Sequence, residues 1–338
     1  VDSKDVYLTS TDEIQYKGKL SFAGIFAQDE IDLADGKVKI IAGARVDLAN
    51  YRDGSLSVID PTSTTGFPEQ NSEVFDENTW TSFSPKVSAL YNFSNRVSGY
   101  LSYSTGFNPP KLDDLSKSGK INKGFKLANP ELTPETIATW EAGFNLQPHN
   151  SLSIEPSIYY STGNDFQYFV PNGDSIDTGG SSIKPVLQRQ NISKVEITGA
   201  EINIRWKALE NITVNAWYAY NHSVISKFDV NEDNPANELE GNYLAEVPKH
   251  TAFASTTWQN KILNTTLTIN FVGEMWADEY NTVTIEDYWM FDINLWKQIT
   301  PRWRASLIVQ DIFDRQPIDK KLRLSPGRFF MGKIQYSL

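Results

Sequence analysis

The sequence predicts an all-β protein, a transmembrane antiparallel β-barrel. In the last fifty residues, large apolar side chains alternate with polar ones in three successive runs, at 289–295, 303–310 and 330–338. A period of two over about ten residues gives a strand one apolar and one polar face. Aromatic residues stand near the ends of these apolar faces, where a barrel strand meets the two lipid interfaces.

The spacing of the strands is the second observation. Short and long connections alternate along the whole chain, as in membrane barrels that place short turns on one side and long loops on the other. A propeller or a sandwich has no reason to sort its loops in this way. A soluble β-sandwich is the alternative, but its strands are usually nearer 5–6 residues long.

In chain order, the first strand carries Leu20, Phe22, Gly24 and Phe26 on one side and ends at a tight turn, 34–37, whose Asp-Gly pair favours a short hairpin. The same alternation predicts about thirteen strands, near 14–33, 38–48, 82–93, 96–106, 135–147, 151–168, 187–206, 212–224, 249–258, 262–274, 285–297, 302–313 and 326–338. We expect the main long loops at 51–80, 107–134, 171–185 and 226–247.

The amino-acid composition agrees with a barrel and excludes some classes of function. The chain of 338 residues is 40% hydrophobic, with a mean hydropathy of −0.41, and has no apolar run near the 18 residues of a spanning helix. Its 9 Trp, 15 Tyr and 18 Phe suit interfacial girdles. The absence of Cys excludes disulfides and thiolate metal sites. A net charge of −11 argues against a nucleic-acid partner.

An odd number of strands has a consequence. Bacterial single-chain barrels have an even number, and an unpaired strand edge in lipid is costly. The first turn belongs to the short-turn side, so we expect the chain to begin within an outer loop. We expect the remaining strands in an upstream segment or in another chain. An exported barrel also needs a signal peptide, so we expect that the start at Val1 is not the gene start.

Several segments resemble, in order, the C-terminal half of TonB-dependent outer-membrane receptors. They are Phe26-Ala27-Gln28-Asp29-Glu30 with Ala42-Gly43-Ala44-Arg45-Val46-Asp47; Ser82-Phe83-Ser84-Pro85-Lys86 with Ser104-Thr105-Gly106-Phe107-Asn108-Pro109-Pro110; Asn129-Pro130-Glu131-Leu132-Thr133-Pro134-Glu135 with Glu141-Ala142-Gly143; Thr198-Gly199-Ala200-Glu201; and Gln310-Asp311-Ile312-Phe313-Asp314. Two positions depart from the family pattern, Asn108 in place of Arg or Lys and Leu338 in place of an aromatic residue.

The resemblance implies that residues 1–338 are one domain, the C-terminal portion of a barrel of about 22 strands. The family's N-terminal plug and its TonB-contacting box have no counterpart in the sequence, so contact with the TonB complex is expected through a plug that this chain lacks. The implied function is TonB-energised uptake of a scarce nutrient across the bacterial outer membrane, with outer-membrane lipid as a partner. A ferric siderophore is the first choice of cargo, and cobalamin, haem and oligosaccharide are alternatives.

Catalysis has little support in the sequence. The three His (His149, His222 and His250) are expected to be solvated or interfacial, and no nucleophile-elbow, zinc-protease or phosphate-loop motif occurs. Asp113 and Asp114 could chelate a cation, but a solvated loop pair is the stronger interpretation. We expect no catalytic residue, no bound metal and no cofactor, because in a ferric siderophore the chelator holds the iron.

Binding is better supported, because the long loops carry aromatic and polar side chains suited to a small-molecule chelate. The candidates are Phe67, Phe75, Trp80, Asn108, Lys111, Tyr243, Trp276 and Tyr280, together with Arg189 between Gln188 and Gln190. Arg189 could reach an anionic group. The rival functions are a passive porin, which predicts a closed even-stranded barrel with an infolded loop, and an adhesin or assembly barrel, which predicts a protein partner.

Overall fold

The computed structural model describes residues 2–6, 13–61, 67, 71–121, 124–177, 183–228, 239–318 and 324–337. Thirteen long strands dominate these residues and confirm the expected thirteen. They are β2 (Glu13–Leu33), β3 (Val38–Ile59), β5 (Asn78–Ser94), β6 (Val97–Asn108), β9 (Glu135–His149), β10 (Leu152–Asp177), β11 (Ile183–Leu209), β12 (Ile212–Phe228), β13 (His250–Trp258), β14 (Asn264–Val272), β17 (Tyr288–Gln298), β18 (Trp303–Gln310) and β19 (Phe329–Tyr336).

Six short strands and one short helix lie in or beside the long connections. They are β1 (Asp2–Val6), β4 (Asn71–Val74), α1 (Leu112–Ser116), β7 (Gly119–Ile121), β8 (Gly124–Leu127), β15 (Met275–Trp276) and β16 (Thr284–Ile285). Among the described residues there is no helix with the length and apolar character that crossing a membrane requires.

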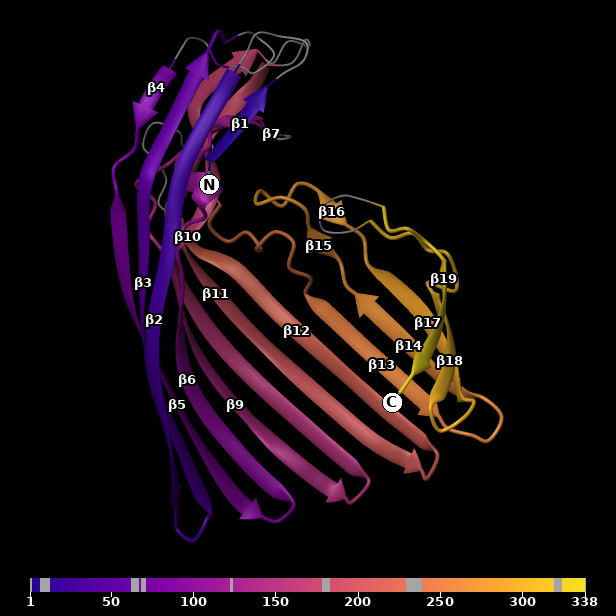
Figure 1. Ribbon diagram of the computed structural model, residues 1–338. Helices are drawn as coiled ribbons and strands as arrows, with labels where there is room; N and C mark the ends of the chain where they lie inside the picture. Colours follow the sequence, from indigo (N-terminus) through magenta and orange to yellow (C-terminus); the bar gives the residue numbers. More distant parts are fainter. Residues whose placement is uncertain are drawn as a thin grey trace.

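The long strands form one antiparallel sheet, each paired with the next along the chain from β2 to β19. The sheet curves into an open trough, with β2 and β19 as its two edges (Figure 1). Within the described residues β1 covers only the first part of β2, up to Lys17. The connections sort as expected, with short turns at one end of the sheet and long loops at the other (Figure 1).

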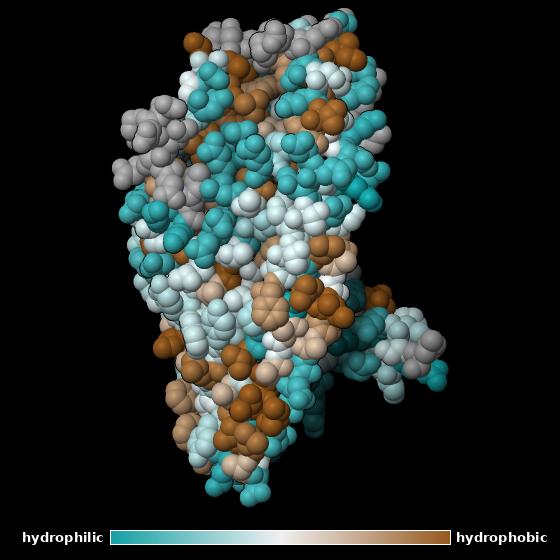
Figure 2. Space-filling model, turned by 90° about the vertical axis from the view of Figure 1, so that its left-hand side faces the viewer, coloured by the Kyte–Doolittle hydropathy of each residue, from teal (hydrophilic) through white to brown (hydrophobic). Residues whose placement is uncertain are grey.

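The register gives the sheet two chemically distinct faces. Cross-strand partners point to the same side, and the ladder runs from Val87 to Tyr103, then to Trp140 and Tyr160. Trp140 is 51% exposed and Val87 is 45% exposed, so this apolar face is bare. On the outside of β2, β3 and β5, apolar residues gather toward the short-turn end and hydrophilic residues toward the long-loop end (Figure 2). Such a band suits the hydrocarbon layer of a membrane.

The opposite face is polar. Ser102 pairs with Glu141, which pairs with Tyr159 on the next strand. The Tyr100 hydroxyl donates a hydrogen bond to the Glu141 carboxylate across 2.5 Å. Phe22 also lies on this side. It pairs with Ala49 of β3, and Ala49 is two residues from Asp47, so the two side chains point to the same face of the sheet. The side of the first strand that carries Leu20, Phe22, Gly24 and Phe26 is therefore the polar side of the sheet.

The strands extend further than expected at the long-loop end, most of all in the predicted loops 51–80 and 171–185, whose bounds are partly wrong. β3 continues to Ile59 and β5 begins at Asn78, inside the predicted loop 51–80. β10 continues to Asp177 and β11 begins at Ile183, inside the predicted loop 171–185. In the first hairpin the register shifts between Lys17 and Lys19, opposite a turn of β3 where Asp53 has φ 57°. This bulge interrupts the alternation on which the prediction depended.

The main hydrophobic core also lies at the long-loop end. It is formed by residues of the β2–β3 hairpin, the β3–β5 connection, the β6–β9 connection and β11: Ile14, Tyr51, Leu56, Val58, Phe67, Phe75, Leu115, Phe125, Ala128, Leu132 and Val186. These segments are distant in sequence, so the core holds the long loops to one another and to the sheet.

Candidate functional site

The β6–β9 connection crosses the hollow side of the sheet at the long-loop end. We call residues 109–134, described except for 122 and 123, the crossing loop. Its helix α1 contacts β2 and β3, and its strand β8 pairs in parallel with β11, from Val186–Phe125 to Gln188–Leu127. β5, β6, β9 and β10 separate these two anchor points in the sheet. The loop therefore spans the trough.

A glycine of β2 lies where α1 packs against the wall. A Cβ at Gly18 would approach Leu112 Cδ1 of α1 at 2.8 Å and Ser116 Oγ at 3.3 Å. Leu115 of α1 is fully buried in the same core as Tyr51 of β3. Tyr51 points toward the hollow side, because its parity is that of Asp47 and Ala49. Burial raises the pKa of Tyr51 to about 12.

A cluster of four charges joins the crossing loop to β11. The buried Lys126 ammonium lies 2.7 Å from the Asp113 carboxylate and 2.9 Å from that of Asp114. Asp114 is buried too, and its second oxygen lies 3.2 Å from Arg189 Nε. The interpretation of Asp113 and Asp114 as a solvated pair is therefore wrong for Asp114. Both acids balance cations of the protein, and the described residues hold no group of three potential metal ligands.

Arg189 has further partners in the wall of the sheet. Its guanidinium carbon lies 4.3 Å from the centre of the Phe169 ring, and its Nη1 donates to the Gln167 carbonyl at 2.8 Å. Stacking on an aromatic face combined with a carboxylate partner is a frequent arrangement for Arg. Arg189 is paired with Asp114 of the same chain, and its contact with an anionic ligand stays a prediction.

Amide side chains fix the rest of the crossing loop. Asn129 donates to the Arg189 carbonyl at 2.8 Å, and Gln188 donates to the Ala128 carbonyl at 3.0 Å. The Ser118 hydroxyl accepts a hydrogen bond from the Ala128 backbone amide at 2.8 Å. These bonds leave the loop well anchored beside β11.

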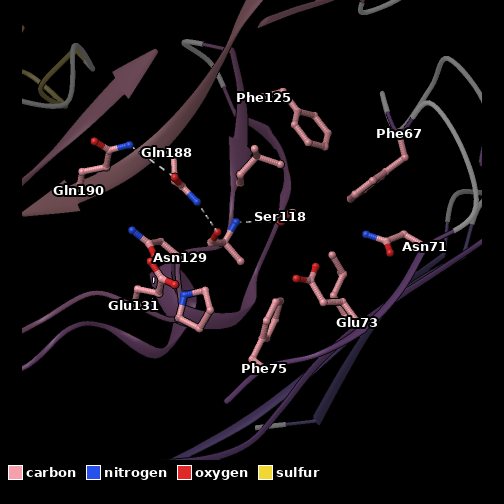
Figure 3. A pocket seen from close by; sticks show the side chains of 14 residues that line it. Phe67, Asn71, Glu73, Phe75, Ser118, Phe125, Asn129, Glu131, Gln188 and Gln190 are labelled. Atoms are coloured by element: carbon pink, nitrogen blue, oxygen red, sulfur yellow. Dashed lines mark hydrogen bonds between the residues drawn. The ribbon is translucent and has the colours of Figure 1, made fainter. Parts of the chain in front are cut away.

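A cavity of about 710 Å³ opens between the crossing loop, the β3–β5 connection and β11. Phe67, Phe75 and Phe125 provide aromatic surface, and the Phe67 and Phe125 rings meet edge to face at 4.9 Å (Figure 3). The remaining lining residues are Leu56, Asn71, Glu73, Ser118, Leu127, Ala128, Asn129, Pro130, Glu131, Gln188 and Gln190. Its size and its mixture of aromatic and polar groups suit a small-molecule ligand.

The charge of the cavity is negative. Glu73 and Glu131 stand on opposite sides of it, one on the β3–β5 connection and the other on the crossing loop (Figure 3). Both side chains are exposed, and within the described residues neither has a cationic or hydrogen-bonding partner for its carboxylate. No Lys or Arg is among the described lining residues. Lys126 and Arg189, which flank lining residues in sequence, are paired with Asp113 and Asp114.

A second group of loop residues lies above β12 and β14. Tyr243 exchanges hydrogen bonds with Asn281, its amide donating to Oδ1 at 2.7 Å and its carbonyl accepting from Nδ2 at 3.0 Å. Lys249 Nζ lies 3.8 Å from the centre of the Tyr243 ring. The Glu246 amide donates to the Trp276 carbonyl at 2.7 Å. Burial, followed by the nearby acids Glu279 and Asp278, raises the pKa of Tyr280.

The fold brings only some of the predicted binding residues together. Phe67, Phe75, Gln188 and Gln190 line the cavity, and Trp80 packs against the same core. Arg189 lies behind the cavity wall, Lys111 precedes α1, and Asn108 donates to Glu135 at 2.8 Å. Tyr243, Trp276 and Tyr280 belong to the second group.

Asn71, Glu73 and Glu131 are among the lining residues that the sequence analysis did not predict. Their positions depend on loop folding that no local pattern signals.

The three His have local roles. His149 in a short turn lies 2.9 Å from the Ser151 hydroxyl, and His250 lies 2.8 Å from the Tyr218 hydroxyl. His222 packs edge to face on Tyr243 at 5.3 Å. His149 and His250 are exposed, which agrees with the predicted solvated role, and an interfacial role of His222 stays a prediction.

Comparison with known proteins gives consistent matches. Residues 3–312 match the family model described as "TonB dependent receptor-like, beta-barrel". The chain is 24% identical over 251 residues to the iron-regulated outer membrane virulence protein of Vibrio cholerae, covering 71% of this chain and 37% of that protein. It is 27% identical over 241 residues to the ferrioxamine receptor of Yersinia enterocolitica, covering 69% and 28%.

Among solved structures, the ferric yersiniabactin uptake receptor FyuA from Yersinia pestis has the same fold, with a TM-score of 0.71 at 16% identity. That similarity covers 99% of this chain and 47% of FyuA. The chain therefore spans about half the length of this structural relative and about a third of the curated ones.

Proposed function

Because the chain belongs to the TonB-dependent receptor family, we propose that it forms the ligand-binding part of an outer-membrane receptor that takes up a ferric siderophore. The family consists of transport receptors rather than enzymes, and its barrels lie in the outer membrane of Gram-negative bacteria. The observation that carries the proposal is the cavity at the long-loop end, which lies on the outer side of such a membrane.

The cavity meets the requirements of the cargo. A volume of about 710 Å³ lies within the range of small-molecule pockets. Its aromatic rings offer apolar contacts, and its amides and carboxylates offer hydrogen-bonding partners. The chelator surrounds the iron, so the protein needs no metal ligand, bound metal or cofactor of its own.

The proposal includes partners that complete the receptor. The open edges of β2 and β19 would pair with further barrel strands, because unpaired backbone amides are costly in lipid. A plug within the lumen would transmit the signal to the TonB complex. Lipid would surround the apolar face.

Uptake by cells tests the proposal. A strain lacking the gene would be grown with iron supplied only as a defined ferric siderophore, haem, or an iron salt, with cobalamin uptake measured in parallel. We expect loss of radioactive iron uptake from at least one ferric siderophore, recovery with the intact gene, and no recovery in a strain that also lacks TonB.

A conductance measurement distinguishes this receptor from the main rival function, a passive porin. A passive porin would give a large, steady current when the purified protein is inserted in a planar bilayer. Such a current, together with siderophore uptake unchanged by the loss of TonB, would contradict the proposal. The crossing loop resembles the infolded loop expected of a porin, so the conductance measurement is needed to distinguish the two functions.

A further inference from the structure

The charged groups of the cavity indicate the charge of its ligand. This inference rests on the proposed function. Two carboxylates, Glu73 and Glu131, face it without partners among the described residues. Two basic side chains of the segments that border it, Lys126 and Arg189, are balanced by Asp113 and Asp114. A ligand therefore meets two negative charges and no free positive one in the described lining.

Ferric siderophores differ widely in net charge. A ferric complex of three catecholates carries three negative charges, and bringing it between two carboxylates is repulsive. A ferric complex of three hydroxamates is neutral, and it is cationic when a protonated amine remains on the chain. Repulsion between like charges at an interface weakens the binding of an unsuitable partner. The two Glu that attract an ammonium group would therefore repel an anionic ligand.

The uncharged lining fits the same class. Phe67, Phe75 and Phe125 form an apolar wall that can cover the methylene chains of a linear hydroxamate. The exposed Asn71 amide has no partner among the described residues and can donate to a hydroxamate oxygen. We propose that this cavity binds a neutral or cationic ferric hydroxamate and discriminates against polyanionic ferric catecholates.

Binding measurements on the protein as its gene encodes it, isolated in detergent, test the proposal. The probes are ferrioxamine B, which keeps an ammonium group, its N-acetylated neutral form, and a ferric tricatecholate. Affinity is measured by quenching of tryptophan fluorescence. We expect ferrioxamine B to bind about three- to tenfold more tightly than the acetylated form at low salt, and the tricatecholate to bind most weakly.

Glu73→Gln and Glu131→Gln test whether the two carboxylates cause this order. Each should weaken ferrioxamine B about threefold, leave the acetylated form unchanged and strengthen the tricatecholate. Glu210→Gln is the matched control, because Glu210 is an exposed acid at the opposite, short-turn end of the sheet. In the unmodified protein, raising the salt to 0.5 M should remove most of the preference for ferrioxamine B, a test that requires no variant.

The outcomes separate the two proposals. If the tricatecholate binds as tightly as ferrioxamine B, or if salt leaves the order unchanged, the charge selection is refuted while the siderophore receptor stands. If no ferric chelate of any charge binds, both proposals fail. Equal weakening of ferrioxamine B and its acetylated form by the Gln variants would also refute the charge argument.

Discussion

Lys126 and Asp114 form an ion pair at 2.9 Å in which both side chains are almost fully buried, at 5% and 7% exposure. The pair lies where the crossing loop meets β11, and Asp113 and Arg189 complete it on either side. Buried charges are tolerated when every member has a partner. The loop that shapes the cavity is therefore held by a set of charges that depend on one another.

Removal of Lys126 tests this dependence. Lys126→Met leaves Asp114 buried with Arg189 alone, and we expect the docked state of the crossing loop to lose about 3 kcal/mol. The barrel strands should stay folded, because their ladders do not involve this pair. Limited proteolysis is the measurement, and cleavage within residues 109–134 should become much faster. Lys261→Met, at an exposed short turn, is the control, and equal cleavage in both variants would contradict the assignment.

The packing of the β2–β3 hairpin gives a second prediction. A Cβ at Gly54 would collide with the Tyr51 hydroxyl and approach its Cζ at 2.7 Å. Gly54→Ala should therefore destabilise the long-loop end by about 1–3 kcal/mol, seen as faster amide exchange in residues 50–59. Tyr51→Phe combined with Gly54→Ala should recover part of the loss. Absence of any recovery would mean that Tyr51 is not the obstacle.

The pH dependence of the same core follows from Tyr51. Burial raises its pKa to about 12, above the value of about 10 for an exposed tyrosine. The folded state therefore favours the neutral phenol. This contribution to stability is complete below pH 10 and is lost as the pH rises toward 12. Loop cleavage by an alkali-tolerant protease should increase over that interval in the unmodified protein and increase less in Tyr51→Phe.

The assignment of the two sheet faces can be tested with two neighbouring residues. Ile158 lies on the apolar face and is 64% exposed, and Ser157 lies on the polar face opposite Glu201. Ile158→Arg should cost about 2–4 kcal/mol in a lipid bilayer. Ser157→Arg should be nearly neutral, because its partner across the strand is an acid. Urea unfolding in liposomes measures both, and a reversed order would contradict the assignment.

The sequence was sufficient to predict the strands, because lipid on one side and water on the other produce a direct alternation. The face of Trp289, Ile293 and Leu307 was predicted correctly for this reason. The prediction failed where that alternation stops, as at Gly54 and Asp53, where the bulge and a left-handed residue interrupt the pattern. Leu338, at the end of the last predicted strand, lies outside the described residues.

The site was predicted less completely. Phe67 and Phe75 were expected in a long loop and Gln188 and Gln190 at the start of a strand, and all four line one cavity. Glu73 and Glu131 were missed because they become neighbours of one space only through the fold of the crossing loop. That fold depends on a parallel pairing of β8 with β11 and on the buried Lys126, and neither has a local sequence signal. Seven ligand contacts stay predictions, those of Trp80, Asn108, Lys111, Arg189, Tyr243, Trp276 and Tyr280.

The position of the crossing loop has a mechanical consequence. It connects two distant parts of the curved sheet, as a chord connects two points of an arc. One end contacts β2 and β3, and the other is hydrogen-bonded to β11. A chord of fixed length limits how far the arc can flatten or tighten. The width of the mouth in this part of the wall is therefore set by the loop as well as by the strands.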